Sequence, residues 1–191
     1  MARPRIHDET VRQRLLEEAS AIIAQQGADA LSMRKAAAAA HTTTAAIYSL
    51  FGSREALIEA VVDEGFQRFA THLRAVPHTD DPDADLLALG RAYRRNALEN
   101  PHFYDVMFHD TSTPRTPEHG SETFNMLADA VQRATESQRD EARIRAYRLW
   151  AYIHGLVSLE LSGLRVPYTD ADEAERSFIA ALRAATSLFN T

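Results

Sequence analysis

The stretch from Thr42 to Leu57 reads TTTAAIYSLFGSREAL. It starts with three threonines and two alanines, continues into a short apolar segment and reaches Gly52, after which comes another hydroxylated residue, Ser53. Serine and threonine are favoured helix N-caps, because the side-chain oxygen accepts a hydrogen bond from a backbone N–H that the helix leaves unpaired. We therefore predict a short helix that begins after Thr43 and ends at Gly52, followed by another helix capped by Ser53.

Two further helices are predicted before this stretch. In residues 8–26 the apolar positions recur at spacings of three and four, and Gly27 follows the last of them; this spacing is typical of an amphipathic helix. Ser32 can cap a second short helix, SMRKAAAA, which ends at His41 and Thr42. Two short helices joined by three or four residues and braced by a longer one form a helix-turn-helix.

The composition of the helix that begins after Thr43 fits a nucleic-acid contact; this helix is the second of the two in the motif. In a helix-turn-helix this helix enters the major groove, where small residues let the backbone come close and threonine can meet phosphates or base edges. Ile47 and Phe51 are four residues apart and are predicted to face inward, whereas the hydroxyl of Tyr48 can reach a phosphate. The pattern alone leaves a second interpretation open, in which TTTAA is only a capped helix start.

The rest of the chain also reads as helical. Ser53 to about Leu73 forms a long apolar-faced helix, and the acidic run TDDPDAD predicts a boundary after it. Further helices are predicted near residues 83–99, 101–109, 120–138, 140–163 and 171–188, with TSTPRTPEHG as a loop. Because no segment alternates apolar and polar residues as a strand would, we expect an all-α fold. We expect a helix-turn-helix domain over 1–54, a linking helix over 53–73 and a helical ligand-binding and dimerisation domain over 74–191.

Composition and charge agree with a globular protein that contacts DNA with one end. Of 191 residues, 45% are hydrophobic and 25% charged, which is ordinary for a folded domain. The net charge is −6, but residues 1–54 carry seven basic and five acidic side chains, so the excess of acids lies in the remainder. The sequence contains no cysteine, which excludes disulfides and thiol chemistry. With no signal-peptide pattern and no apolar run of about 18 residues, we expect a cytoplasmic protein.

The segment ALSMRKAAAAAHTTTAAIYSLFGSREALIEAVV resembles the N-terminal domain of TetR-family transcriptional regulators. The shared features are Arg34 in a small-residue helix, the pair Tyr48 and Phe51, and the Ser53-Arg54-Glu55-Ala56-Leu57 helix start. The resemblance covers about residues 8–66 and implies binding to double-stranded operator DNA. The candidate DNA-binding residues are Arg34, Thr42, Thr43, Thr44, Ala45, Tyr48 and Arg54.

Three positions depart from the family pattern. His41 stands where glycine is usual in the turn, Thr42 stands where an apolar residue is usual, and Leu50 replaces a frequent histidine. A histidine can occupy the left-handed backbone region, although at a cost relative to glycine. These departures and the acidic net charge keep an alternative open, in which a helix-turn-helix scaffold has lost DNA binding and acts as an interaction or small-molecule-binding protein.

A second resemblance concerns the body of the chain. Residues 150–155, Trp-Ala-Tyr-Ile-His-Gly, resemble the Trp-x-x-x-His-Gly signature of one C-terminal domain type of TetR-like regulators. Trp150 and His154 are one helical turn apart, so they can share a small-molecule pocket in which His154 is the polar group; in the other interpretation His154 is a core residue bonded to a neighbour. The candidate ligand-binding residues are Tyr93, Phe103, Tyr104, Met107, Phe108, Met126, Trp150 and His154.

The resemblance further implies a repressor that a small, largely apolar inducer releases from DNA, and a homodimer built from the last two long helices. Apolar residues on more than one side of those helices fit such an interface; they are Ile144, Leu149, Val157, Leu161, Phe178, Ile179, Leu182 and Leu188. We expect no enzyme activity and no cofactor, although an all-helical enzyme using His154 and Glu160 is a weaker alternative. His102, Asp105 and His109 could share a helix face as metal ligands, but no metal is expected.

Overall fold

The computed structural model describes residues 5–108, 120–164 and 170–189, and every regular element in those ranges is helical. The all-α fold predicted from the sequence is therefore confirmed. The chain forms two compact units, which we call the head and the body. The head consists of Met1–Arg68 and Asn100–His119, and the body consists of Phe69–Glu99 and Gly120–Thr191.

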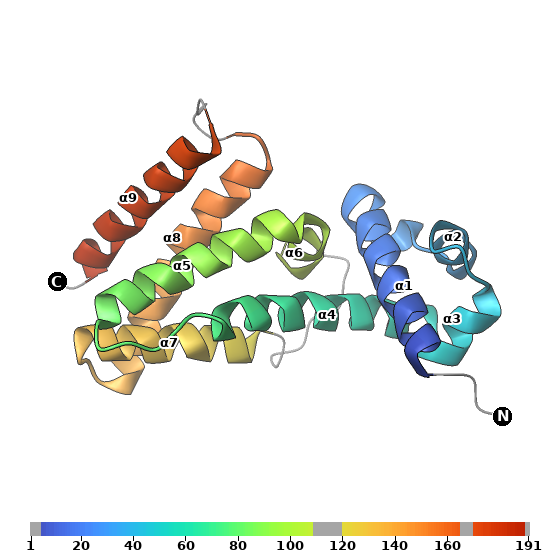
Figure 1. Cartoon of the computed structure of the whole chain (residues 1–191), viewed down its shortest axis with the longest axis horizontal. Helices are drawn as coiled ribbons and strands as arrows, with labels where there is room; N and C mark the ends of the chain where they lie inside the picture. Colours follow the sequence, from blue (N-terminus) through green and yellow to red (C-terminus); the bar gives the residue numbers. More distant parts are fainter. Residues whose placement is uncertain (1–4, 109–119, 165–169, 190–191) are drawn as a thin grey trace. The chain divides into compact units, whose positions relative to one another are not determined.

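The head contains the helix-turn-helix (Figure 1). Its elements are α1 (Arg5–Gln26), the 3-10 turn η1 (Ala28–Ala30), α2 (Met33–Ala39), α3 (Thr44–Phe51), α4 (Arg54–Arg74) as far as Arg68, and α6 (Pro101–Phe108). The core is made by the inward faces of these helices and includes Leu15, Leu16, Ile23, Leu31, Ile47, Leu57, Val61, Val62 and Phe103. Burial of this apolar surface is the main term that holds such short helices in place.

All three predicted N-caps of the head are present. Ser32 Oγ accepts a hydrogen bond from the Lys35 amide at 3.2 Å. Thr43 Oγ1 accepts from the Ala46 amide at 3.2 Å, and Ser53 Oγ accepts from the Ala56 amide at 3.1 Å. Each cap fixes the first turn of its helix, so the start points of α2, α3 and α4 follow directly from the sequence.

The turn between α2 and α3 depends on His41. This residue has φ of 51°, in the left-handed region that the sequence led us to expect. The His41 amide donates to Ala38 O at 3.3 Å, and the Thr42 amide donates to Ala37 O at 2.9 Å. These two bonds are the helix-ending pattern that usually contains glycine, and they satisfy carbonyls that the end of α2 leaves unpaired.

Helix α6 belongs to the head, which differs from the sequence-based division at residue 74. Phe103 and Val106 are part of the same buried cluster as the apolar face of α1. The Arg68 guanidinium lies 4.2 Å from the centre of the Phe103 ring. At Gly65 of α4 an added Cβ would stand 2.8 Å from Met107 Cγ, so the absence of a side chain lets α4 and α6 approach closely.

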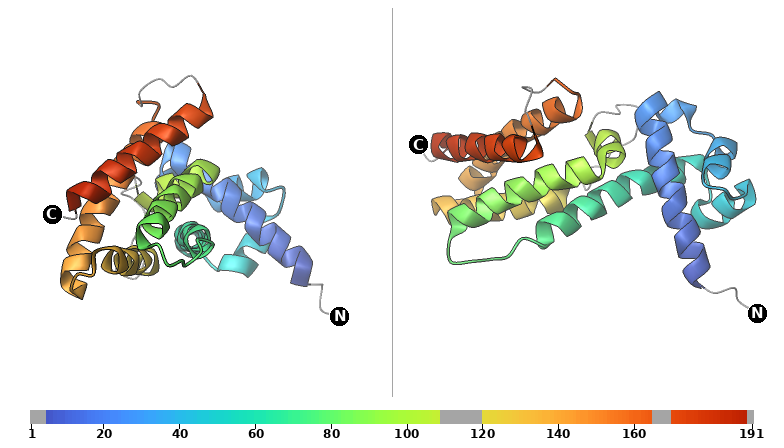
Figure 2. Two further views of the ribbon diagram at one scale, coloured as in Figure 1. Left: turned by 60° about the vertical axis from the view of Figure 1, so that its left-hand side comes forward. Right: turned by 45° about the horizontal axis from the view of Figure 1, so that its top comes forward.

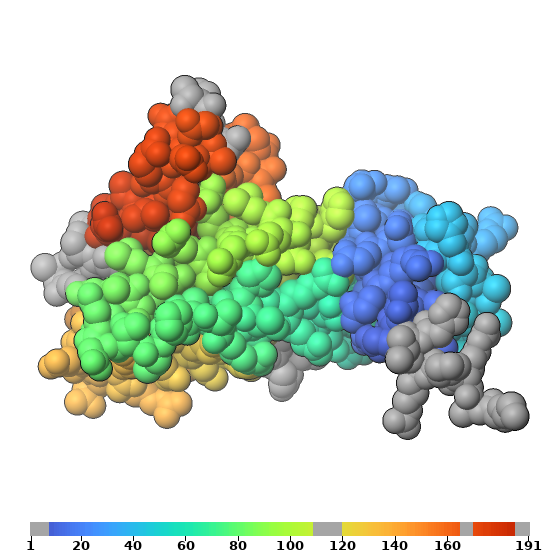
Figure 3. Space-filling model, in the orientation of Figure 1, coloured from blue at the N-terminus to red at the C-terminus, as the bar shows by residue number. Residues whose placement is uncertain are grey.

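The body consists of the end of α4 with α5 (Pro82–Glu99), α7 (Ser121–Thr135), α8 (Arg139–Leu161) and α9 (Ala171–Phe189). Helix α7 packs along α8, α8 packs on α9, and α5 contacts all three (Figure 2). At the surface α5 and α9 are neighbours (Figure 3). The bounds of these helices, and of α6, agree with the predicted ranges to within three residues. Residues 109–119, which include His109 and nearly all of the predicted loop TSTPRTPEHG, lie outside the described residues.

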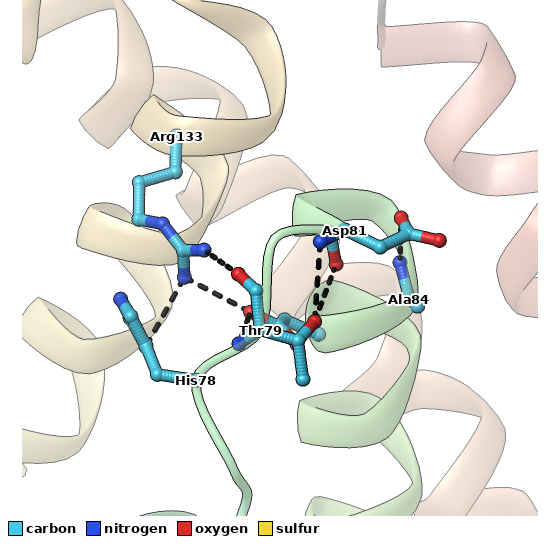
Figure 4. Close-up of polar contacts among 6 residues, drawn as sticks. His78, Thr79, Asp81, Ala84 and Arg133 are labelled. Atoms are coloured by element: carbon cyan, nitrogen blue, oxygen red, sulfur yellow. Dashed lines mark hydrogen bonds and ion pairs between the residues drawn. The ribbon is translucent and has the colours of Figure 1, made fainter.

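Arg133 of α7 fixes the connection between α4 and α5 (Figure 4). Its guanidinium donates to Thr79 O at 2.8 Å and to Asp85 Oδ2 at 3.1 Å, and it lies 3.1 Å from His78 Nδ1. The Thr79 hydroxyl and amide donate to the same carboxylate at 2.6 and 3.0 Å. These bonds from Thr79, supported by Arg133, lower the pKa of the buried Asp85 below its ordinary value.

Among the described helices, none is both long and apolar enough to cross a membrane.

Candidate nucleic-acid interface and ligand site

Helix α3 presents a small polar face to solvent. Thr44, Ala45, Tyr48 and Ser49 are exposed, with 55% of Tyr48 accessible, whereas Ile47 is completely buried. Phe51 is partly buried against the head core, and the Arg12 guanidinium lies 5.8 Å from the centre of its ring. The predicted division of this helix into an inward apolar side and an outward Thr/Tyr side is confirmed. Ser49 was not among the predicted residues, although its position four residues after Ala45 could have indicated it.

The three threonines differ in what they can offer. Thr44 and Ala45 open α3 and are exposed, whereas Thr42 is half-buried. Thr43 is exposed, and its oxygen accepts from the Ala46 amide while its hydroxyl hydrogen can still be donated elsewhere. Arg34 is exposed on α2. The structure therefore brings Arg34, Thr43, Thr44, Ala45 and Tyr48 to the solvent-facing surface of the motif.

Arg54, which was predicted to contact DNA, also makes contacts within the head. Its Nε donates to Leu31 O at 2.6 Å and its Nη2 to Ala28 O at 2.5 Å, and the Asp29 and Glu55 carboxylates lie 4.0 and 3.6 Å away. The guanidinium therefore joins the start of α4 to the segment between α1 and α2. A guanidinium that donates to two backbone carbonyls acts as a brace within the head, and its remaining N–H groups leave the predicted DNA contact a prediction.

The second candidate site is an aromatic cluster in the body around Trp150 and His154 of α8. The two rings lie 6.0 Å apart, and His154 Nδ1 shares a hydrogen bond of 2.9 Å with the Tyr93 hydroxyl of α5. Tyr93 is also packed edge-on against Phe69, with the ring centres 4.9 Å apart. The neighbour-bonded histidine considered from the sequence is thus present, and a ligand would meet a histidine already oriented by Tyr93.

Two residues that the sequence analysis missed complete this cluster. Phe124 of α7 and Tyr147 of α8 lie with their ring centres 6.4 and 6.0 Å from Trp150. Tyr147 precedes Trp150 by three residues and could have been found by helical spacing, but Phe124 lies on another helix. Met126, a predicted wall, is half-buried on α7.

The other four predicted ligand-binding residues lie in the head. Phe103, Tyr104 and Met107 are buried there, and Phe108 packs against Phe66 and Tyr104 with ring centres 6.0 and 5.0 Å apart. They are on α6, which contacts α1. All four residues take part in the packing of α6 within the head, and a ligand contact at them stays a prediction.

Glu160 is part of an ion-pair network around the buried Arg94. Arg94 of α5 donates to both Glu160 oxygens, at 2.8 and 2.7 Å, and also to Glu175 of α9. Arg91 donates to the second oxygen of Glu175 at 2.8 Å. The hydrogen bonds to Glu160 raise the pKa of Arg94, which keeps it charged. The network links α5, α8 and α9 and explains Glu160 as a structural residue.

For the predicted metal option, His102 and Asp105 are on α6 and His109 lies outside the described residues. No group of three or more potential metal ligands is found in the part of the chain that the structure describes.

One side of α8 exposes apolar side chains to solvent. Ile144, Tyr147, Tyr152 and Leu159 are 55, 60, 39 and 49% accessible. Of the residues predicted for a dimer interface, only Ile144 is in this set; Leu149, Val157, Phe178 and Leu182 are buried in the body, and Leu161 and Ile179 are half-buried. The side chain of Leu188 lies outside the described residues. The buried residues of this set are used where α8 and α9 pack on each other and on α5, and the dimer interface stays a prediction.

Comparison with protein families identifies the chain. Residues 15–61 match the bacterial regulatory proteins of the tetR family, and residues 86–185 match the tetracyclin repressor-like C-terminal domain. The chain therefore belongs to the TetR family of bacterial transcriptional regulators, as the sequence resemblance implied. Members of this family are generally not enzymes.

Solved structures show the same fold over nearly the whole chain. The TetR family transcriptional regulator PfmR from Thermus thermophilus is 18% identical, with a TM-score of 0.72 over 91% of this chain and 97% of its own. A TetR family transcription regulator from Marinobacter aquaeolei is 21% identical, with a TM-score of 0.74 over 96 and 97%. The fatty acid degradation regulator FadR from Bacillus halodurans is 15% identical, with a TM-score of 0.74 over 99 and 96%. The search of curated proteins gave no match.

Proposed function

We propose that the protein is a cytoplasmic transcriptional repressor that binds operator DNA as a homodimer and is released by a small, largely apolar ligand. The observation that supports this best is the solvent-facing side of α3, where Thr44, Ala45 and Tyr48 are exposed while Ile47 anchors the helix in the core. Small residues at the start of a recognition helix permit close approach to base edges.

DNA binding is tested with the Tyr48→Phe variant. A phenol that reaches a phosphate positions the protein without reading sequence, so its loss should weaken specific and non-specific binding by a similar factor. Binding to the DNA upstream of the gene is measured by fluorescence anisotropy at several salt concentrations. The control is Ser121→Ala, which removes an exposed hydroxyl from the start of α7. A wild-type protein that shows no salt-dependent binding would favour the scaffold alternative, and a change of sequence preference in Tyr48→Phe would contradict the assigned role.

The ligand is proposed to contact Trp150 and His154, with Tyr93 and Met126 nearby. Aromatic and apolar walls with one oriented polar group are the usual make-up of a small-molecule site. A ligand that prefers a conformation unsuited to DNA shifts the population by its difference in affinity for the two states. Coupling of about 1–3 kcal/mol would weaken DNA binding about 5–150-fold.

The ligand proposal is tested by the fluorescence of Trp150, which is the single tryptophan of the chain. Candidate inducers should quench it and release DNA over the same concentration range. Trp150→Phe keeps an aromatic ring in the cluster and should weaken the inducer's effect while leaving the DNA affinity of the ligand-free protein nearly unchanged. An inducer that acts equally on Trp150→Phe would place the ligand elsewhere.

A further inference from the structure

A surface groove of about 530 Å³ lies in the body, between the residues that follow α4, the outer side of α5 and Glu175 near the start of α9. Its volume is within the range of small-molecule sites. The residues that define its chemistry are Val76, Pro77, Arg91, Arg95, Leu98 and Glu175. None of them belongs to the aromatic cluster around Trp150, so the groove is a separate feature of the body.

The apolar and basic residues of α5 reach the groove by helical spacing. Arg91, Arg95 and Leu98 follow each other at intervals of four and three residues, which puts them on one side of the helix. Leu98 is 41% accessible although it is a large apolar residue. Val76 and Pro77 border the same groove from the connection that follows α4. The groove thus combines an exposed apolar strip with a row of guanidinium groups.

Most of the charged groups in the groove have a partner. Glu175 is paired with Arg91 and Arg94, and Arg94 is paired also with Glu160. The Glu99 carboxylate lies 2.8 Å from His72 Nε2. Arg95 makes no hydrogen bond or ion pair with any residue in the described ranges. An arginine offers a planar set of N–H donors that fits a carboxylate in a bidentate manner. Among the described residues, the guanidinium of Arg95 therefore has no anionic partner, and it lies beside apolar surface.

We propose that this groove binds an amphipathic monoanion, namely a carboxylate with a short alkyl chain. The carboxylate pairs with Arg95, and the alkyl chain covers Leu98, Val76 and Pro77. The charge complementarity of Arg95 selects an anion over a neutral ligand, and the apolar strip selects a chain over a small inorganic anion. The site lies outside the inducer site proposed above and does not depend on DNA binding.

The proposal is tested with octanoate as the probe on the full-length protein. Binding is followed by NMR shifts of the Val76 and Leu98 methyl groups during titration with octanoate, butyrate and octanol. We expect octanoate to shift both methyl groups saturably, butyrate to bind at least tenfold more weakly because each buried methylene adds to the affinity, and octanol to bind more weakly because it lacks the charge.

Arg95→Gln should weaken octanoate binding about tenfold or more, and added salt should weaken it only in the wild type. Arg139→Gln, which removes an exposed arginine from the first turn of α8, is the matched control and should bind as the wild type does. Equal binding to Arg95→Gln, or octanol binding as tightly as octanoate, would overturn the proposal. A loss of octanoate binding in Trp150→Phe would move the ligand to the aromatic cluster. If octanoate does not bind and Arg95→Gln alters the oligomeric state, the groove is a contact between copies of the chain and the proposal is wrong.

Discussion

At the scale of single residues, His41 is a non-glycine residue at a position whose backbone conformation favours glycine. Its φ of 51° suits glycine, and it is held there by the two hydrogen bonds that end α2. A non-glycine residue in the left-handed region costs about 1–2 kcal/mol. The turn therefore retains strain that the surrounding packing of α2 and α3 must offset.

His41→Gly should consequently raise the free energy of unfolding of the head by about 0.5–1 kcal/mol, because the relief of strain exceeds the extra chain entropy of glycine in the unfolded state. Urea unfolding of both proteins measures the difference. Ala38→Gly changes an exposed residue inside α2 and should have the opposite sign, with a loss of about 1 kcal/mol. A His41→Gly protein no more stable than the wild type would show that the turn is not strained.

Variants of Arg54 and Arg34 should differ in their effects: the Arg54 variant should lower stability, and the Arg34 variant should lower DNA affinity. Arg54→Ala removes charge-assisted hydrogen bonds to Leu31 O and Ala28 O and should lower the stability of the head by about 1–3 kcal/mol. Arg34→Gln alters an exposed side chain, so stability should change by less than about 0.5 kcal/mol while DNA binding falls and its salt slope decreases by about one. Thermal unfolding and anisotropy titrations measure the two effects. An Arg54→Ala protein of unchanged stability would contradict the brace role.

The sequence could predict the residues whose partners are local and could not predict those whose partners are distant. Ser32, Thr43 and Ser53 cap helices through amides three residues away, and such spacing can be read directly. Arg54 is bonded to carbonyls 23 and 26 residues earlier, so its assignment as a DNA contact rested on the family pattern alone. Phe124, which packs on Trp150 from another helix, was missed for the same reason.

At the scale of elements, α6 and α8 show that periodicity predicts a helix but does not predict which neighbouring helix each of its faces packs against. The aromatic residues of α6 were assigned to a pocket because they are apolar, but apolar character does not identify the helix that they pack against. On α8 the most apolar residues, such as Leu149 and Val157, are completely or nearly buried, and the exposed apolar side contains two tyrosines. Helix existence followed from the sequence, whereas the choice of face required the neighbouring helices.

The α4–α5 connection should give a pH-dependent contribution to stability through Asp85. The pKa of its carboxyl group is lowered in the folded protein, so the stabilisation is fully present above the ordinary aspartate pKa of about 3.9 and is lost as the pH falls through the lower folded value. Asp85→Asn should therefore be less stable than the wild type near neutral pH, and the difference should shrink below about pH 4. Urea unfolding across this pH range measures it.

Asp83→Asn is the matched control for this experiment, because Asp83 is exposed in the same first turn of α5. It should remain close to the wild type at every pH. A stability gap between wild type and Asp85→Asn that persists unchanged at about pH 2 would contradict the assignment of the carboxylate to this network.

At the scale of the whole molecule, the exposed apolar side of α8 fits an interface between two copies. A two-fold dimer uses the same surface on both subunits. A substitution that places a charge on this surface therefore places it on both sides of the interface. The double variant Ile144→Glu with Leu159→Glu should be monomeric by light scattering at micromolar concentration, with its circular dichroism unchanged. Leu98→Glu changes an exposed apolar residue of the body away from α8 and should remain dimeric. A monomeric wild type would overturn the interface altogether.

The network of Arg94 with Glu160 and Glu175 has a consequence for the behaviour of the body on heating. Charged groups lose favourable hydration as the temperature rises, so the cost of removing them from water decreases, whereas the stabilisation from apolar burial levels off. The ion pairs that attach α9 to α5 and α8 should therefore contribute a larger share of the stability of the body at high temperature than at low temperature. Replacing the network by apolar residues of similar volume would then be tolerated best at low temperature and least at high temperature.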